Sequence, residues 1–359
     1  MQVDTTYLKT CDARLGSLAS DVNPALSYTS THLEGFSQWG DGRLAGAALG
    51  SHGTYLASTE TNLAATKRLL SAAADALNTI ALRYDATDDD QSVAFRNVFK
   101  DLDPNAATPP ITAATSPSGG SAAEPSAGLS APEAMPDLNP VFLAIMQWPD
   151  YLSFTWWARW LINQGFQLVW PGIGGGDVFQ WLWSEVGGDW DRIYTAGSAF
   201  GQIGDYFSRL GDATRDEAVA MFQGWTEGEA ATAAGEFFAE IVAAFEAQLA
   251  PYADLELKYQ KAAASSYMLC QAAYSGLDAL GDHVVAMALG VGSIGEAVAA
   301  FFSGGATAPM AIVSAVAAFI AELSAIWGSA VAAVMAIGGL MNGLQATSLT
   351  ITSVPIPEA

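Results

Sequence analysis

The sequence predicts an all-α protein with two antiparallel helical hairpins, a connecting linker, a Trp-rich segment and an apolar helical tail. Three observations predict this fold class. Leucines recur at seven-residue intervals in the N-terminal part, apolar residues recur at spacings of three and four in a second segment, and a stretch rich in Pro, Ala and Ser separates the two. Heptad and three-four spacings place apolar side chains on one face of a helix.

Residues 1–100 are expected to form the first hairpin. Pro24 is expected to bend or restart its first helix, and the six glycines from Gly35 to Gly53 to form the turn. The apolar stripe of the first helix is Leu8, Cys11, Leu15, Leu18 and Val22. The stripe of the second helix is Leu56, Leu63, Leu70, Leu77 and Tyr84, with Ala73 and Ile80 on the intervening seam.

Two segments of unusual composition follow. Residues 101–140 are expected to be a flexible linker, because Pro, Ala, Ser and Gly dominate them. Residues 141–186 are expected to be Trp-rich and helical, and the stretch 141–190 holds eight of the eleven tryptophans. These indoles favour packing against the second hairpin, with contact to a partner or a membrane interface as the alternatives.

Residues 187–288 are expected to form the second hairpin. Its turn is expected in the sequence GWTEGEAATAAG, which starts at Gly224. The stripe of its first helix is Ile193, Ala196, Phe200, Ile203, Phe207 and Leu210. The stripe of its second helix is Phe237, Ile241, Phe245, Leu249, Tyr252, Leu255, Tyr259, Ala262, Leu269, Ala273, Leu277 and Leu280.

Residues 289–359 form a tail of low charge, in which Glu322 is the one charged residue between positions 297 and 357. Either apolar stretch beside Glu322 is long enough to span a bilayer. The soluble alternative is a helical hairpin around residues 303–305 that folds back on the Trp-rich segment. In a membrane, Glu322 is the pH-sensitive position, because an ionised carboxylate at bilayer depth is costly unless it pairs or protonates.

Composition argues against several functions. The chain carries 14 Lys and Arg against 37 Asp and Glu, a net charge of −23, which disfavours nucleic acid as a partner. Cys11 and Cys270 lie far apart, the three histidines form no cluster, and no metal or cofactor is expected. A disulfide between the two cysteines is left open. The glycines of residues 290–295 lack the strands of a nucleotide-binding unit, so that no enzyme is indicated.

The turn Trp225-Thr226-Glu227-Gly228 between two amphipathic helices resembles the WXG-type helical hairpins of type VII (ESX) secretion substrates. The first hairpin offers Trp39-Gly40-Asp41-Gly42, and its opening, Val3-Asp4-Thr5-Thr6-Tyr7-Leu8, is similar to small ESX-associated secreted proteins of mycobacteria and related actinobacteria. Both turns depart from the family pattern, since two residues rather than one separate Trp39 from Gly42 and Trp225 from Gly228.

Proteins of this family carry a Tyr-x-x-x-Asp/Glu secretion signal near the end of the second helix, and Tyr84 and Asp88 occupy that place. Two further matches, Tyr252 with Glu256 and Tyr274 with Asp278, are better explained as ordinary helix residues. Position distinguishes the first match, because Tyr84 ends the leucine heptads and precedes three consecutive aspartates.

The resemblance implies a non-catalytic protein exported to the medium or the cell envelope through type VII secretion. Its implied partners are the secretion machinery, a small WXG-like protein or a second copy of itself, with membrane contact through the tail. The N-terminus lacks the basic start and apolar run of a Sec signal peptide. The alternative is a non-secreted helical scaffold that its tail anchors in the cytoplasmic membrane.

Overall fold

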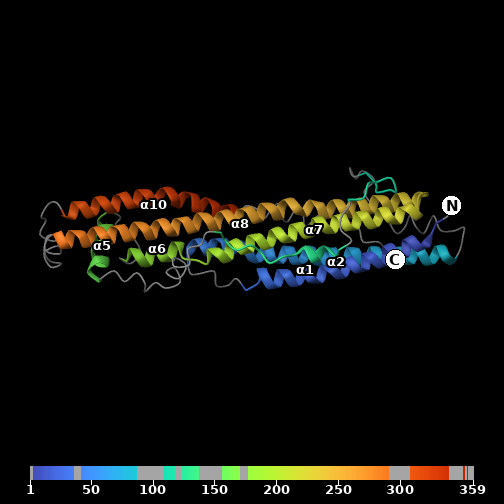
Figure 1. The fold of residues 1–359 in the computed structure, drawn as a ribbon, viewed down its shortest axis with the longest axis horizontal. Helices are drawn as coiled ribbons and strands as arrows, with labels where there is room; N and C mark the ends of the chain where they lie inside the picture. Colours follow the sequence, from blue (N-terminus) through green and yellow to red (C-terminus); the bar gives the residue numbers. More distant parts are fainter. Residues whose placement is uncertain are drawn as a thin grey trace.

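The computed structural model describes residues 3–35, 42–86, 109–118, 123–136, 156–169, 177–290 and 308–338, together with Ile351 and Val354. Every regular element in these ranges is a helix, and the helices lie side by side in a long, narrow bundle (Figure 1). The all-α class that the sequence predicts is therefore confirmed.

The bundle is built from long helices with a few short ones at its periphery. The long helices are α1 (Thr5–Leu33), α2 (Arg43–Ala86), α7 (Trp190–Gly224), α8 (Glu229–Gly290) and α10 (Ala308–Gly338). The short elements are the 3-10 helix η1 (Pro125–Gly128), α5 (Trp156–Val169) and α6 (Val178–Val186). With 62 residues at roughly 1.5 Å per residue, α8 extends over about 93 Å and runs along most of the molecule (Figure 1).

α1 and α2 pack against each other in opposite directions. The Lys67 ammonium on α2 donates to Asn23 Oδ1 on α1 at 2.8 Å, and the earlier His52 on α2 reaches the later Leu33 carbonyl on α1. The predicted stripe of α1 is buried throughout, as are Leu63, Leu70 and Leu77 on α2. The heptad spacing therefore identified the packed face of this pair correctly.

α1 runs through Pro24 as one helix, so that it does not restart there, which was one of the two alternatives that the sequence predicted. A proline inside a helix leaves the carbonyl four residues earlier without its usual donor. Here the Asn23 side-chain amide donates to that carbonyl, of Ser20, at 2.9 Å. The neighbouring side chain thus replaces the missing bond, and the stripe of α1 stays on one face across the proline.

α2 begins at Arg43, so that Gly46, Gly50 and Gly53 lie within a helix rather than in the predicted turn. Helical glycine is unfavourable by about 1 kcal/mol relative to alanine. Burial on the opposite face of this first part of α2 offsets that cost, since Leu44 and Tyr55 are packed in the core. The other buried residues here are Ala45, Ala48 and His52.

α7 and α8 form a second antiparallel pair that three glycines on α7, seven residues apart, allow to approach closely. A Cβ added at Gly197 would lie 2.6 Å from Tyr259 Cβ, and one added at Gly204 would lie 2.8 Å from Tyr252 Cβ. A Cβ added at Gly211 would lie 3.6 Å from Phe245 Cβ. Each glycine therefore receives a large aromatic residue from α8.

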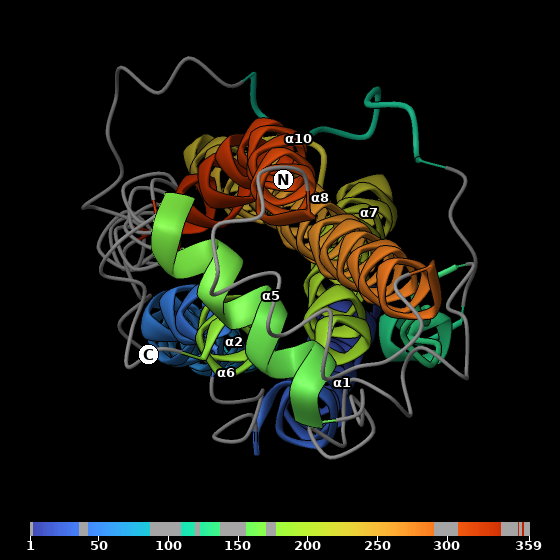
Figure 2. The same ribbon diagram turned by 90° about the vertical axis from the view of Figure 1, so that its left-hand side faces the viewer.

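The two pairs pack together along α1 and α7, and α10 lies beside α8 at the end that carries α5 (Figures 1 and 2). α10 is one continuous helix through Glu322, whereas the sequence suggested two apolar stretches on either side of that residue. Residues 303–305, the predicted tip of a tail hairpin, lie outside the described residues. α10 also contacts α5, so that the tail and the Trp-rich segment are neighbours.

Part of the predicted flexible linker is fixed against the bundle. In residues 123–136, the Ser126 N–H donates to Asp21 Oδ2 on α1 at 2.9 Å, and the Met135 N–H donates to Asp191 Oδ1 on α7 at 2.8 Å. The Arg209 Nε–H of α7 also donates to the Pro125 carbonyl at 3.0 Å. Side chains of α1 and α7 thus supply the hydrogen-bond partners that composition alone does not reveal.

Candidate functional site

Four helix ends meet at one end of the bundle, which we call the Trp225 pole: the starts of α1 and α8 and the ends of α2 and α7. The Asp4 N–H, just before α1, donates to the Gly224 carbonyl at the end of α7 at 3.1 Å. The Asp4 carboxylate also accepts from the Thr6 N–H at 3.0 Å and caps α1. The pole is at the right of Figure 1.

Trp225 fills the interior of this pole. It follows the last residue of α7, and its side chain is fully buried, with a stacked contact to Phe222 at 6.0 Å between ring centroids. Gly228 has φ 113°, a conformation that disfavours residues with a Cβ. The Thr232 N–H then donates to the Gly228 carbonyl at 3.1 Å as α8 begins. The chain therefore reverses its direction between the buried Trp225 and Gly228, whose φ is positive.

Tyr84, in the last turn of α2, meets Trp225. The tyrosine is half-buried, which raises the pKa of its hydroxyl, and the adjacent Trp225 side chain acts on that pKa in the opposite direction. These two residues belong to different hairpins and are far apart in the sequence. The fold thus brings the aromatic residue of the predicted signal against the aromatic residue of the second turn.

Of the other predicted site residues, the two that the structure describes, Gly42 and Glu322, lie away from this pole. Gly42 lies just before α2, and about 60 Å of helix separates it from Tyr84 at roughly 1.5 Å per residue. Its predicted turn partner Trp39, and Asp88 of the predicted signal, lie outside the described residues. Glu322 lies within α10. The two hairpin turns are therefore at opposite ends of the first pair and do not form one site.

Burial distinguishes two of the three Tyr-x-x-x-Asp/Glu matches, Tyr84 and Tyr252. Tyr252 is fully buried, and its hydroxyl donates to Thr59 Oγ1 at 3.0 Å, so that a partner could reach it only by opening the bundle. The side chains of Tyr274 and Asp278 in α8 lie outside the description. Tyr84 is partly accessible at a helix end.

A buried polar seam joins α2 to α8, and the sequence analysis did not identify it. Tyr259 pairs with His52 Nδ1 at 3.0 Å, Tyr252 pairs with Thr59, and Asn62 Nδ2 donates to Gln248 Oε1 at 3.2 Å. His52 and Thr59 are seven residues apart, as are Tyr252 and Tyr259. This polar heptad beside the leucine heptad was the signal that could have revealed the seam.

The partners of His52 in the seam determine which nitrogen of its neutral imidazole carries the proton. Its Nε2–H donates to the Leu33 carbonyl at 2.8 Å, and its Nδ1 accepts from the Tyr259 hydroxyl. Burial lowers the pKa of the His52 imidazole, an effect that the bond to Leu33 partly opposes. Burial raises the pKa of Tyr252 to about 12 and that of Tyr259 well above its usual value, so that both phenols remain donors.

The lowered pKa of His52 predicts a loss of stability in acid. The unfolded state binds the proton more readily than the native state, so that this contribution is fully present above about pH 6.5 and is lost as the pH falls towards the native pKa. Thermal unfolding at pH 7.5 and 5.5 should show a smaller decrease in midpoint for His52→Gln than for the unaltered protein. Equal decreases in the His52→Gln variant and the unaltered protein would contradict the prediction.

The chemistry available elsewhere in the described residues is limited. Within the described residues no group of three or more His, Cys, Asp or Glu side chains is arranged to hold a metal ion. Cys11 and Cys270 are both free thiols in the core, and burial raises the pKa of Cys270 to about 12. Of the glycine motif at 290–295, only Gly290 is described, as the last residue of α8.

Comparisons of the chain with protein-family models, with curated proteins and with solved structures found no match. The function therefore has to be inferred from the residues and their arrangement.

Proposed function

We propose that this protein is a type VII secretion substrate that acts through protein or membrane contacts rather than catalysis. The observation that supports the proposal is the contact between Tyr84 and Trp225 at the Trp225 pole. Each residue comes from one of the two motifs that resemble the WXG-type family. The proposal assigns the chain to export into the medium or the cell envelope.

Residues 226–228 of the second turn are exposed at the same pole as Tyr84, which supports recognition of both motifs by one partner. A buried indole and a positive-φ glycine make a rigid end to the second pair, and Tyr84 is packed onto that end. A rigid site loses less conformational entropy on binding than two mobile motifs would. We therefore assign the Trp225 pole as the surface that the secretion machinery, or a small WXG-like partner, contacts.

Export tests the proposal directly. In an actinobacterial host with an active type VII system, the double variant Tyr84→Ala, Asp88→Ala is expected to remain in the cells, whereas the unaltered chain appears in the culture medium. The physical reason is the loss of the phenol and of the carboxylate four residues later in the sequence. Immunoblots of medium and cell fractions provide the measurement.

Two controls keep export separate from folding. Tyr194→Ala removes a tyrosine of intermediate exposure from α7, distant from the pole, and should be exported normally. Circular dichroism of the purified double variant should show unchanged helical content. Normal export of the double variant would refute the assignment of Tyr84 and Asp88 as the signal.

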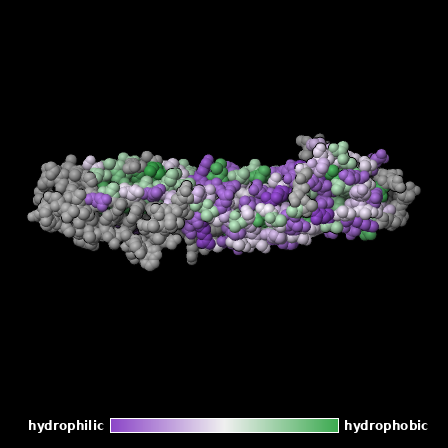
Figure 3. Space-filling model, in the orientation of Figure 1, coloured by the Kyte–Doolittle hydropathy of each residue, from purple (hydrophilic) through white to green (hydrophobic). Residues whose placement is uncertain are grey.

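A second candidate function, membrane anchoring or perturbation, is favoured by α10. Residues Val313–Ile337 form the one helix in the described ranges that is long and apolar enough to cross a membrane, with mean hydropathy 1.8. Only 25% of its most apolar part is buried within the protein. Apolar surface is correspondingly visible over α10 in Figure 3. Such exposed apolar surface is suited to lipid or to a partner.

Liposome leakage tests this candidate. The purified protein should release a trapped dye faster at pH 5 than at pH 7.5, because an ionised Glu322 opposes entry of α10 into the bilayer. Glu322→Gln should remove much of the difference. Glu236→Gln, an exposed carboxylate on α8, is the control and should retain it. Absence of leakage at both pH values would exclude the membrane function.

A further inference from the structure

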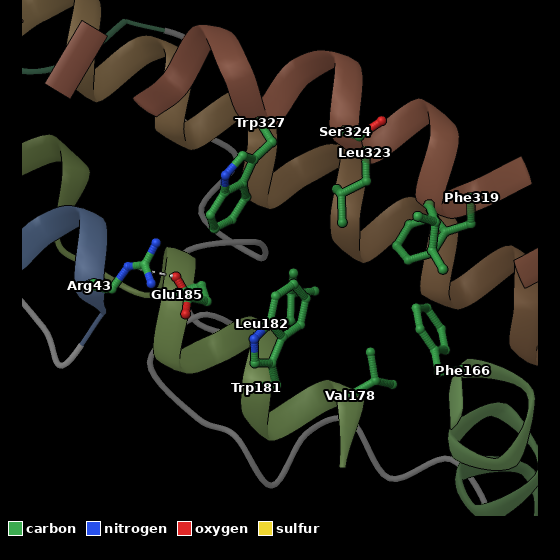
Figure 4. A pocket seen from close by; sticks show the side chains of 11 residues that line it. Arg43, Phe166, Val178, Trp181, Leu182, Glu185, Phe319, Leu323, Ser324 and Trp327 are labelled. Carbon is green, nitrogen blue, oxygen red and sulfur yellow. Dashed lines mark ion pairs between the residues drawn. The ribbon is translucent and has the colours of Figure 1, made fainter. Parts of the chain in front are cut away.

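An apolar cavity lies between α6 and α10 (Figure 4), at the end of the molecule away from the Trp225 pole (Figure 1). Its volume is about 320 Å³. This lies at the lower end of the range of small-molecule sites, roughly 300 to 1,000 Å³. α10 forms one wall of the cavity, α6 forms the opposite wall, and α5 and α2 each contribute a residue.

Aromatic pairs border the cavity along its length. Trp181 of α6 and Trp327 of α10 are stacked at 6.3 Å between ring centroids, with 21° between their planes. Phe166 of α5 and Phe319 of α10 meet edge to face at 5.8 Å, at the far end in Figure 4. The remaining walls are mainly aliphatic, so that the interior favours hydrocarbon over water.

One end of the cavity carries an ion pair. Arg43 Nε lies 3.1 Å from Glu185 Oε2. The Arg43 side chain is 72% exposed, whereas that of Glu185 is 14% exposed. Nε is the atom that contacts Glu185, and the guanidinium has two further nitrogens with four N–H donors. The cation therefore stands at the opening with donors that can receive a second anion.

We infer that this cavity binds a single-chain carboxylate amphiphile, such as a free fatty acid of about ten carbon atoms. The hydrocarbon chain would lie between the two aromatic pairs, and the carboxylate would accept hydrogen bonds from the terminal nitrogens of Arg43. The volume of about 320 Å³ lies at the small end of the range of ligand sites, which favours a chain of medium length over a long one. This inference is independent of the proposed secretion.

The planar guanidinium favours a carboxylate over other head groups. Arginine binds carboxylates through parallel N–H donors, and such charge-assisted bonds are about twice as strong as neutral ones. A cationic head would meet the exposed guanidinium first. An uncharged head would make weaker hydrogen bonds to the same donors.

Isothermal titration calorimetry with saturated carboxylates tests the inference on the full-length protein, below the micelle concentration of each compound. Affinity should rise about fourfold for each added methylene and level off near ten carbons, when the cavity is full. Decanol and decyltrimethylammonium carry the same chain with other heads. Both should bind about tenfold more weakly than decanoate.

Variants assign binding to this cavity. Val178→Phe and, independently, Ile320→Phe place extra volume in the cavity and should abolish binding; if one fails to fold, the other serves. Ala317→Phe adds the same ring on the exposed face of α10 and should bind normally. The double variant Arg43→Gln, Glu185→Gln removes both charges and should weaken decanoate about tenfold, and decanol much less. Arg68→Gln, an exposed arginine elsewhere on α2, is its control.

Several results would overturn the inference. Unchanged decanoate binding in folded Val178→Phe or Ile320→Phe would place the ligand elsewhere, and no binding of any chain length would leave the cavity without a ligand. Equal affinities for decanoate, decanol and decyltrimethylammonium would remove Arg43 as the recognising group. Displacement of decanoate by phosphatidylglycerol vesicles would replace the free acid with a bilayer acyl chain.

Discussion

Replacing Trp225 with Ala is expected to lower the free energy of unfolding by about 3 to 5 kcal/mol, the usual cost of removing a large buried aromatic side chain. The indole is fully buried where four helix ends meet, and it contacts Phe222 and Tyr84. The surrounding helix ends cannot collapse into the vacated volume without separating elsewhere. Urea unfolding followed by circular dichroism provides the measurement.

The loss of unfolding free energy should depend on the volume that is removed and on its position in the bundle. Trp225→Phe retains most of the apolar contact and should cost less than the alanine variant. Trp327→Ala, at a half-buried position on α10, should also cost less. A Trp225→Ala protein with an unchanged unfolding midpoint would mean that the indole does not support the pole.

Gly204→Leu is expected to prevent the close contact between α7 and α8 and to cost at least as much as the loss of Trp225. Even the Cβ of the new side chain would lie 2.8 Å from Tyr252 Cβ, where non-bonded carbon atoms do not fit. Separation of the helices would also expose the seam between Tyr252 and Thr59. The variant should unfold at a much lower temperature, or fail to give a soluble folded protein.

Gly16 provides the matched control for Gly204. It lies within α1, and a Cβ added there would meet no atom within 4 Å. Gly16→Ala should therefore increase stability by roughly 0.5 to 1 kcal/mol through helix propensity alone. If Gly204→Leu were tolerated as well as Gly16→Ala, the close approach of α7 and α8 would not be required for folding.

Local periodicity predicted much of the core correctly. The stripe from Ile193 to Leu210 is buried in full, because α7 presents one apolar face. On α8 one position of the predicted stripe is not buried. Leu249 is 38% exposed, and the neighbouring Gln248 is fully buried instead. α8 contacts α7 and α10, and its seam meets α2, so that position in the bundle rather than apolar character decides which side chain is inside.

The candidate site was predicted only as separate motifs. The sequence singled out Tyr84 and Trp225 individually, by heptad position and by a turn motif. Their contact depends on the relative placement of two hairpins, which no local pattern encodes. The apolar cavity depends likewise on residues from α2, α5, α6 and α10, which are distant in sequence.

The amino-acid sequence alone determined the helical class and most of the packed faces of α1, α2, α7 and α8, because helix periodicity is local. Tertiary structure decided the rest: whether α1 passes through Pro24, where residues 123–136 lie, and how α2 is aligned with α8. Apolar faces are non-directional and tolerate many alignments. The alignment is instead set by partners that must match one another across the bundle, His52 with Tyr259 and Gly204 with Tyr252.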